Sequence, residues 1–506
     1  MTPLTWSVLQ FTLHDWVFLP GYATVGNIAG RPYLNISLFA TLYHLMGRSQ
    51  QDLLAYMEAT LYMQLPAGVE IPLIPVPRRV LLPAFWELIK MRLRGQQGIR
   101  RLPAYLRDTP AWFARMRQQL AQTNTCADLM RLWQEELRPH ILDGVWTVLG
   151  TVSQSTDYTL GLRRALTPLV GEEDAGLLIA NLSDETGLLA SLEPLAALGE
   201  VAEGKLSHAA YLARFGHRGP DEFELSLPRP AEDPEWLEGQ VARFQAAPAD
   251  IKGMVAKQRA AFDAAWGRFC TRHPAKVTRM QRRIQESARR ARLREQARSE
   301  YVRDRWLVRL FALRAAELCR FGDEIFFLRL EEVLRLLGGD ESGLENIIEW
   351  REAYQRFRAL PNPPTVILGR FDPFAWAAES GHRTDFYDAR CQVSPVLSDS
   401  RLIKGAPGSA GVVEGIVRRL DSADQAGQLQ SGEVLVTAMT DISWTPLFPR
   451  LSAVVTDVGA PLSHAAIVAR ELGIPAVVGC GDATLRLRTG DRVRVDGGRG
   501  IVEKVG

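Results

Sequence analysis

The stretch from residue 453 to residue 479, AVVTDVGAPLSHAAIVARELGIPAVVG, restricts the fold of this chain more than any other. Ser463 is a favoured residue at a helix N-cap, Gly473 is a favoured C-cap, and Pro475 prevents the helix from continuing. The predicted elements are a buried strand over 453–456, a tight loop over 457–462, a helix over 464–472 and a strand from residue 474 to 478. The order strand, loop, helix, strand places one imidazole, His464, at the start of the helix.

A histidine at this position has a definite chemistry. The first N–H groups of a helix have no partner within the helix, and the helix dipole adds partial positive charge at that end. This environment disfavours an imidazolium ion and favours a bound anion, so His464 suits a covalent phosphohistidine intermediate. A histidine at a helix start is also common as a solvated or capped residue, and the position alone leaves both interpretations open.

The longer string resembles the signature of the mobile phosphohistidine domain of PEP-utilising enzymes, a family with PEP synthases, pyruvate phosphate dikinases and rifampicin phosphotransferases. The resemblance includes GAPGSAG from residue 405 and VLVTAMTDISWTPLF from residue 434. It implies that His464 accepts the phosphoryl group and that Thr456, Gly459 and Ser463 cradle the phosphate. The family usually has two glycines in the loop, whereas this chain has Ala460 at the second position, which alanine tolerates only where φ is negative.

Composition predicts where the chain divides. Residues 401–506 hold 15 of the 41 glycines and alternate short valine-rich runs with turn residues, whereas the first 390 residues have helical spacing and composition. We therefore expect a multidomain protein. A large, mainly α-helical domain over 1–390 precedes a polar linker over 380–404 and a swivelling β/β/α phosphohistidine domain over 401–506.

The helical part resembles the substrate-binding region of rifampicin phosphotransferase-like proteins, through GRPYLNIS from residue 30, RFGHRGPDEFELSLPR from residue 214 and DEIFFLRLEEV from residue 323. Within it, His217, Arg218 and Glu222 are candidates for binding substrate or docking phosphorylated His464. The alternative is a turn with polar surface residues. A second SHAA string contains His208, but no strand or glycine loop precedes it, which predicts an ordinary helix-start residue.

Charge and cysteine content exclude several classes of protein. The net charge of +2 argues against a nucleic-acid partner, and the arginine-rich segment 279–309 is interpreted as a long helix with a solvated face. The 5 cysteines include no CxxC spacing, so we expect neither a disulfide scaffold nor a metal site, and a cytoplasmic location. No apolar run approaches the roughly 20 residues of a membrane-spanning helix.

The resemblance also implies a function. In the fused members of the family an ATP-grasp domain charges the histidine, and no such segment is recognised here. The sequence therefore predicts the phosphoryl-carrying component of a split, dikinase-type phosphotransferase that binds no cofactor directly. ATP and Mg²⁺ are expected on a separate ATP-grasp partner, and a hydroxyl-bearing small molecule is expected as acceptor. The alternatives are a non-catalytic binding or regulatory protein that retains the fold, and a truncated fusion.

Overall fold

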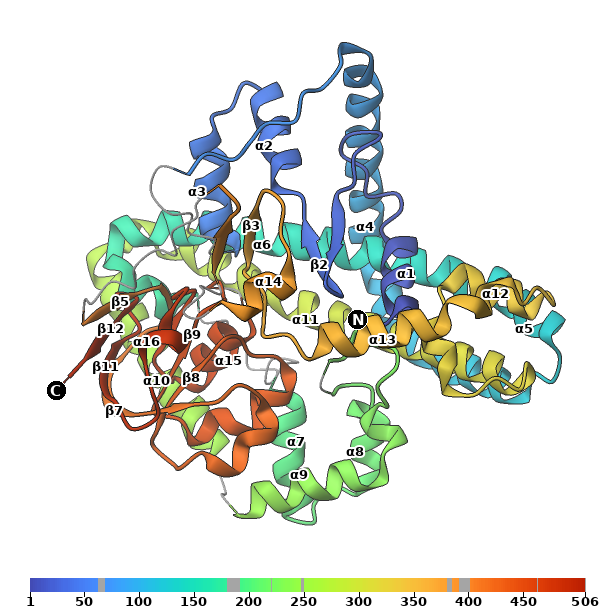
Figure 1. Cartoon of the computed structure of the whole chain (residues 1–506). Helices are drawn as coiled ribbons and strands as arrows, with labels where there is room; N and C mark the ends of the chain where they lie inside the picture. The colour runs from blue at the N-terminus through green and yellow to red at the C-terminus, as the bar shows by residue number, and fades with distance from the viewer. Residues whose placement is uncertain are drawn as a thin grey trace.

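The computed structural model describes residues 1–61, 69–179, 192–219, 221–246, 250–379, 385–390, 401–461 and 463–505. The amino-terminal part is mainly helical, and the carboxyl-terminal part is built on a β-sheet with helices packed on it, as the sequence predicts (Figure 1).

Three long helices, α4, α6 and α11, pack against one another and form the frame of the helical part. Its helices are α1 (Pro3–Thr12), α2 (Ile36–Leu45), α3 (Gln50–Leu61), α4 (Arg78–Gln122), α5 (Cys126–Leu132), α6 (Arg138–Leu178), α7 (Glu193–Ala202), α8 (His208–Phe215), α9 (Pro234–Ala246), α10 (Ile251–Arg272), α11 (Val277–Leu318), α12 (Leu330–Leu337), α13 (Ile347–Arg358) and α14 (Pro373–Ala378). Two small sheets accompany them, an antiparallel pair of β1 (Val25–Ile28) with β2 (Arg31–Leu34) and a parallel pair of β3 (Val366–Leu368) with β4 (Phe386–Asp388).

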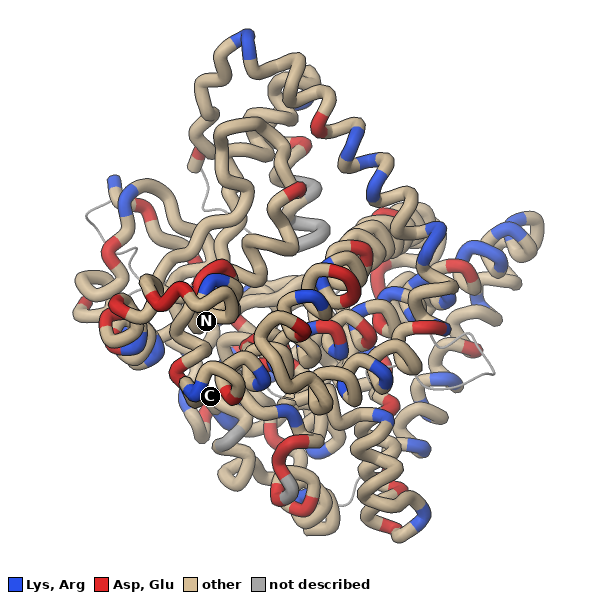
Figure 2. Tube along the Cα trace, turned by 90° about the vertical axis from the view of Figure 1, so that its right-hand side faces the viewer, with Lys and Arg blue, Asp and Glu red and all other residues tan. Residues whose placement is uncertain are grey.

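The core of this frame lies where α4 and α11 meet α1 and α12, and it includes Trp112, Trp133, Trp306 and Phe311. A long helix over the arginine-rich segment is confirmed as α11, but the interpretation of its arginines as a solvated face is wrong at Arg294, which is buried. The guanidinium of Arg294 lies beside the Glu295 carboxylate at 3.0 Å, so a buried countercharge replaces solvent. Figure 2 shows acidic and basic residues interspersed along the trace.

The carboxyl-terminal sheet has eight strands in the order β5-β12-β11-β7-β8-β9-β10-β6. Strands β7 to β10 pair in parallel at the centre, and the remaining pairs are antiparallel. The strands are β5 (Leu402–Lys404), β6 (Ala406–Ser409), β7 (Val412–Arg419), β8 (Val434–Thr437), β9 (Ala453–Thr456), β10 (Ala476–Val478), β11 (Arg492–Asp496) and β12 (Ile501–Lys504), and the helices are α15 (His464–Leu472) and α16 (Ala483–Arg486).

The local prediction for the 453–478 stretch agrees with the structure. Strand β9 and helix α15 have the expected bounds, and Gly473 ends the helix in the left-handed conformation at φ 68°. Strand β10 begins at Ala476, two residues later than expected, after Pro475. Every described residue of β9 and β10 is buried, because central parallel strands are covered on both faces.

The predicted linker falls largely outside the described residues, since 380–384 and 391–400 are among those not described. The described residues of that range contain β4, which pairs with β3, and β5, which pairs with β12. The domain boundaries therefore stay predictions. Among the described residues, no helix combines the length and the apolar character needed to cross a membrane.

Candidate active site

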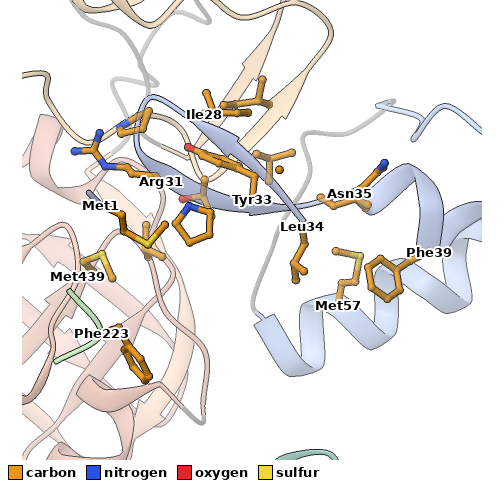
Figure 3. A pocket seen from close by; sticks show the side chains of 18 of the residues that line it. Met1, Ile28, Arg31, Tyr33, Leu34, Asn35, Phe39, Met57, Phe223 and Met439 are labelled. Carbon is orange, nitrogen blue, oxygen red and sulfur yellow. The ribbon is translucent and has the colours of Figure 1, made fainter. Parts of the chain in front are cut away.

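A cavity of about 1890 Å³ lies between the helical part and the amino-terminal end of α15. Figure 3 shows how different elements contribute to its wall, with Tyr33 from β2, Phe39 from α2, Met57 from α3 and Met439 from the carboxyl-terminal part. Most of the lining is aromatic or aliphatic, and charged groups from α11 and from the loop at 221–224 interrupt it. A wall of this kind suits a bulky, mostly apolar molecule with a few fixed polar contacts.

His464 lies in the wall of this cavity as the first residue of α15. Its Nδ1 is 3.1 Å from the Thr440 hydroxyl, and its Nε2 is 3.0 Å from the Thr445 hydroxyl. The ring of Phe448 contacts the imidazole edge to face. Because both ring nitrogens meet hydroxyl groups, the imidazole is held in one orientation.

The surroundings keep the imidazole neutral. Burial is the main cause, and the guanidinium of Arg298 the second, that lowers the pKa of His464 to about 3. The carboxylate of Glu295 acts in the opposite direction, and Arg218 contributes a smaller lowering. A neutral ring nitrogen keeps the lone pair that attack on phosphorus requires.

The three residues predicted to flank the phosphate come together beside α15. A Cβ atom added to Gly459 would lie 3.1 Å from the Thr456 Oγ1 and 3.2 Å from the Ser463 Oγ, so the loop has no room for a side chain there. Both of those hydroxyl oxygens are buried and have no hydrogen-bond partner among the residues that the structure describes. Two unpaired buried hydroxyls beside a helix N-terminus are suited to receive the oxygens of an anion.

The prediction that Ser463 caps α15 is correct for its position and backbone, but its hydroxyl makes no capping hydrogen bond. The second SHAA string shows the ordinary arrangement, in which the Ser207 hydroxyl accepts from the Ala210 N–H at 3.2 Å and His208 is exposed at the start of α8. The same four residues thus form a capped surface helix in one place and an uncapped, cavity-facing helix in the other. Among the described residues, Ala460 is not one of the non-glycine residues with positive φ, so alanine is tolerated in the loop.

The cluster of His217, Arg218 and Glu222 is buried, so its interpretation as a surface turn is wrong. The Glu222 carboxylate accepts from Arg218 Nε at 2.9 Å and from Arg298 Nη2 at 2.9 Å. Through these contacts Glu222 connects the loop to the arginines that surround His464. His217 lies farther inside, where its Nε2 is 2.8 Å from the Ser299 hydroxyl, and burial holds its pKa well below the usual value.

Sequence reasoning missed three residues that contact His464, namely Thr440, Thr445 and Phe448, and two that influence its charge, namely Glu295 and Arg298. The two threonines belong to the VLVTAMTDISWTPLF string. This string contributed to the resemblance to the mobile phosphohistidine domain, but no role was predicted for its residues. The four-residue spacing of Arg294 and Arg298 places both on one face of α11, which is a signal that sequence alone offered. In the described part of the chain, no group of three or more His, Cys, Asp or Glu side chains could hold a metal ion.

Comparison with known proteins agrees with this geometry. Residues 429–500 match the family described as PEP-utilising enzyme, mobile domain. This match confirms the resemblance to the mobile domain of the PEP-utilising enzymes that was drawn from the 453–479 string.

Individual relatives cover longer parts of the chain. It is 31% identical over 314 residues to the prodigiosin synthesizing transferase PigC of Serratia marcescens, covering 58% of this chain and 33% of that protein. It is 48% identical over 187 residues to a probable phosphoenolpyruvate synthase of Staphylothermus marinus, covering 35% and 22%. It is 36% identical over 182 residues to the rifampicin phosphotransferase of Streptomyces sviceus, covering 36% and 19%. The chain spans no more than a third of the length of these relatives.

Proposed function

We propose that this chain carries a phosphoryl group on His464 and transfers it to a hydroxyl group of a small molecule bound in the cavity. The observation that carries the proposal is the position of a neutral imidazole in the cavity wall, beside two buried hydroxyls that lack partners. Relatives named as a rifampicin phosphotransferase and as phosphoenolpyruvate synthases support a phosphotransferase.

In the first step, a ring nitrogen of His464 attacks the phosphorus atom of a donor, and the bond from that phosphorus to the leaving oxygen of the donor breaks, with its electron pair passing to the oxygen. The hydroxyls of Thr456 and Ser463 donate hydrogen bonds to the phosphoryl oxygens, and the free N–H groups at the start of α15 stabilise the same negative charge. The threonine hydroxyl on the other ring nitrogen keeps the ring in position. The hydroxyl on the attacking nitrogen must turn away when the phosphoryl group arrives.

In the second step, the acceptor hydroxyl attacks the phosphoryl group from the cavity side. The transferring group carries negative charge on its outer oxygens, and catalysis consists mainly of positioning and of stabilising that charge. Arg298 lines the cavity and is fixed by Glu222, so its guanidinium is placed to meet the incoming phosphoryl group. The aromatic lining would hold a bulky, apolar acceptor.

We assign the charging of His464 to an ATP-grasp protein that binds ATP and Mg²⁺, because the resemblance to the PEP-utilising enzymes implies a dikinase-type reaction. In this proposal the carboxyl-terminal domain moves between the ATP-grasp partner and the cavity. A mobile carrier is required because one histidine cannot be in line with two distant sites at once.

The test is phosphorylation of the chain by a purified ATP-grasp protein of the PEP synthase type, with ATP labelled in the β-phosphate. We expect acid-labile label on the wild type and on His208→Ala, which removes the histidine of the other SHAA string. His464→Ala should carry none. Equal labelling of His464→Ala and wild type, or absence of label from both, would refute the proposal.

A further inference from the structure

Transfer to a hydroxyl releases a proton, and the cavity that His464 lines is also lined by carboxylates. Of the four acidic residues that line the cavity, three come from α11 and the loop at 221–224, namely Asp221, Glu224 and Glu295. Two of them are already engaged. Glu295 pairs with Arg294 at 3.0 Å, and Glu224 accepts hydrogen bonds from the hydroxyls of Thr2 and Thr5 at 2.8 and 2.7 Å.

Asp221 differs from both, because its carboxylate has no hydrogen-bond or ion-pair partner among the described residues. The residue is exposed and lines the cavity, and the Asp441 carboxylate of the carboxyl-terminal part is close enough to raise its pKa. An unpaired carboxylate at this end of the cavity can accept a proton without first breaking another contact.

The backbone conformation of Asp221 is a second observation that points to a role for this residue. Asp221 has φ 45°, in the left-handed region that L-residues rarely adopt and that glycine adopts without cost. Strained residues of this kind cluster at active sites and ligand-binding loops, where the strain is retained because the side chain has a task. Here the left-handed turn presents Asp221 to the cavity while Glu222, the next residue, points to the buried arginines.

We propose that Asp221 accepts the proton of the acceptor hydroxyl during transfer from phosphorylated His464, an assignment that rests on the function proposed above. The oxygen–phosphorus bond forms as the nitrogen–phosphorus bond breaks. The electron pair of the breaking bond returns to the ring nitrogen, and the hydroxyl proton passes to the Asp221 carboxylate. The carboxyl group then loses this proton to water in the cavity.

The surroundings of Asp221 shift its pKa in the direction that favours a base. Burial raises the pKa of Asp221, and the carboxylates of Asp441 and Glu224 raise it further. Arg358 and the terminal amine of Met1 oppose that rise. A base is most effective when its pKa lies near the working pH, so an upward shift from the usual value of a carboxyl group is in the useful direction.

The experiment separates proton transfer from the loading of His464. Wild type, Asp221→Asn, Asp221→Gly, His464→Ala and the control Asp108→Asn, at an exposed carboxylate of α4, are treated with potassium phosphoramidate, which phosphorylates histidines without a partner protein. After the reagent is removed, loss of phosphate from His464 is followed by mass spectrometry between pH 5 and 9. It is measured in water alone and with 2-naphthalenemethanol as the probe alcohol.

We expect all chains except His464→Ala to become phosphorylated at residue 464. Both Asp221 variants should then transfer phosphate about 100-fold more slowly than wild type and Asp108→Asn. The wild-type rate should rise with pH as the Asp221 carboxyl ionises and then level off, whereas the rates of the Asp221 variants should stay flat. Asp221→Gly should unfold at a temperature no lower than wild type, because glycine accepts φ 45°, which separates loss of chemistry from loss of fold.

Transfer by Asp221→Asn at the wild-type rate, with the wild-type pH profile, would overturn the assignment. It is also overturned if wild type loses phosphate to water and to the alcohol no faster than free phosphohistidine does. Absence of phosphate from residue 464 in every chain would refute the carrier function itself, so the two failures are distinguishable.

Discussion

The neutral state of His464 can be measured through its reactivity toward diethyl pyrocarbonate, a reagent that modifies only the unprotonated imidazole. With a pKa of about 3, His464 is about 99% neutral at pH 5, whereas an imidazole with the usual value of 6.5 is about 3% neutral. We therefore expect the modification rate of His464 to stay constant between pH 8 and pH 5. N-acetylhistidine in the same solution should slow about thirtyfold.

The assay follows the His464 peptide by mass spectrometry at a series of pH values, with each rate corrected for hydrolysis of the reagent. Two variants test the cause of the shift. Arg298→Gln removes a positive charge that disfavours the imidazolium ion, so it should raise the pKa of His464 and move the loss of reactivity to higher pH. Glu295→Gln removes a negative charge and should move that loss to lower pH.

The pH profile of the wild type tests whether burial lowers the pKa of His464. A His464 rate that falls more than tenfold between pH 8 and pH 5 would show that the ring is solvated and would refute the reasoning. Identical pH profiles for the two charge variants would show that the charges of Arg298 and Glu295 do not influence the pKa of His464.

Three further predictions concern the residues around the site. Thr456→Val removes a buried hydroxyl that has no partner among the described residues, so urea unfolding should show a gain of about 1–3 kcal/mol in stability. Phosphorylation of the chain should become slower, and a loss of stability would contradict the assignment of that hydroxyl as unpaired. In Gly459→Ala the new Cβ would lie 3.0 Å from the Val478 Cβ, so the free energy of unfolding should fall by about 1–3 kcal/mol. In Gly427→Ala no atom lies within 4 Å of the new Cβ, so the free energy of unfolding should not change, and equal effects of the two substitutions would refute the crowding argument. Glu222→Ala leaves the guanidinium groups of Arg218 and Arg298 without their carboxylate, so urea unfolding should show a loss of about 3–5 kcal/mol in stability. Glu172→Ala, at an exposed ion pair, should lose about 0–1 kcal/mol, and similar losses for the two variants would contradict the burial of the cluster.

Residue propensities and capping residues were enough to predict the strand, loop and helix that position His464. The bounds of β9 and α15 follow from a run of β-branched residues, an N-cap serine and a C-cap glycine, all of which act within a few residues of one another. The division into a helical part and a sheet-based part follows in the same way from glycine and valine content. These features were predictable because propensity and capping depend on neighbours along the chain.

What only the tertiary structure decided is the surroundings of His464. Its threonine contacts come from residues 24 and 19 positions away in the sequence, and Arg298 comes from a helix of the other part of the molecule. Burial of Arg218 and Glu222 depends on how α11 packs beside their loop, and a turn of polar residues has the same local sequence whether it is solvated or covered. The SHAA strings at 207–210 and 463–466 share the same four residues and the same N-cap serine, and packing leaves one serine hydroxyl to cap its helix and the other without a described partner beside a cavity.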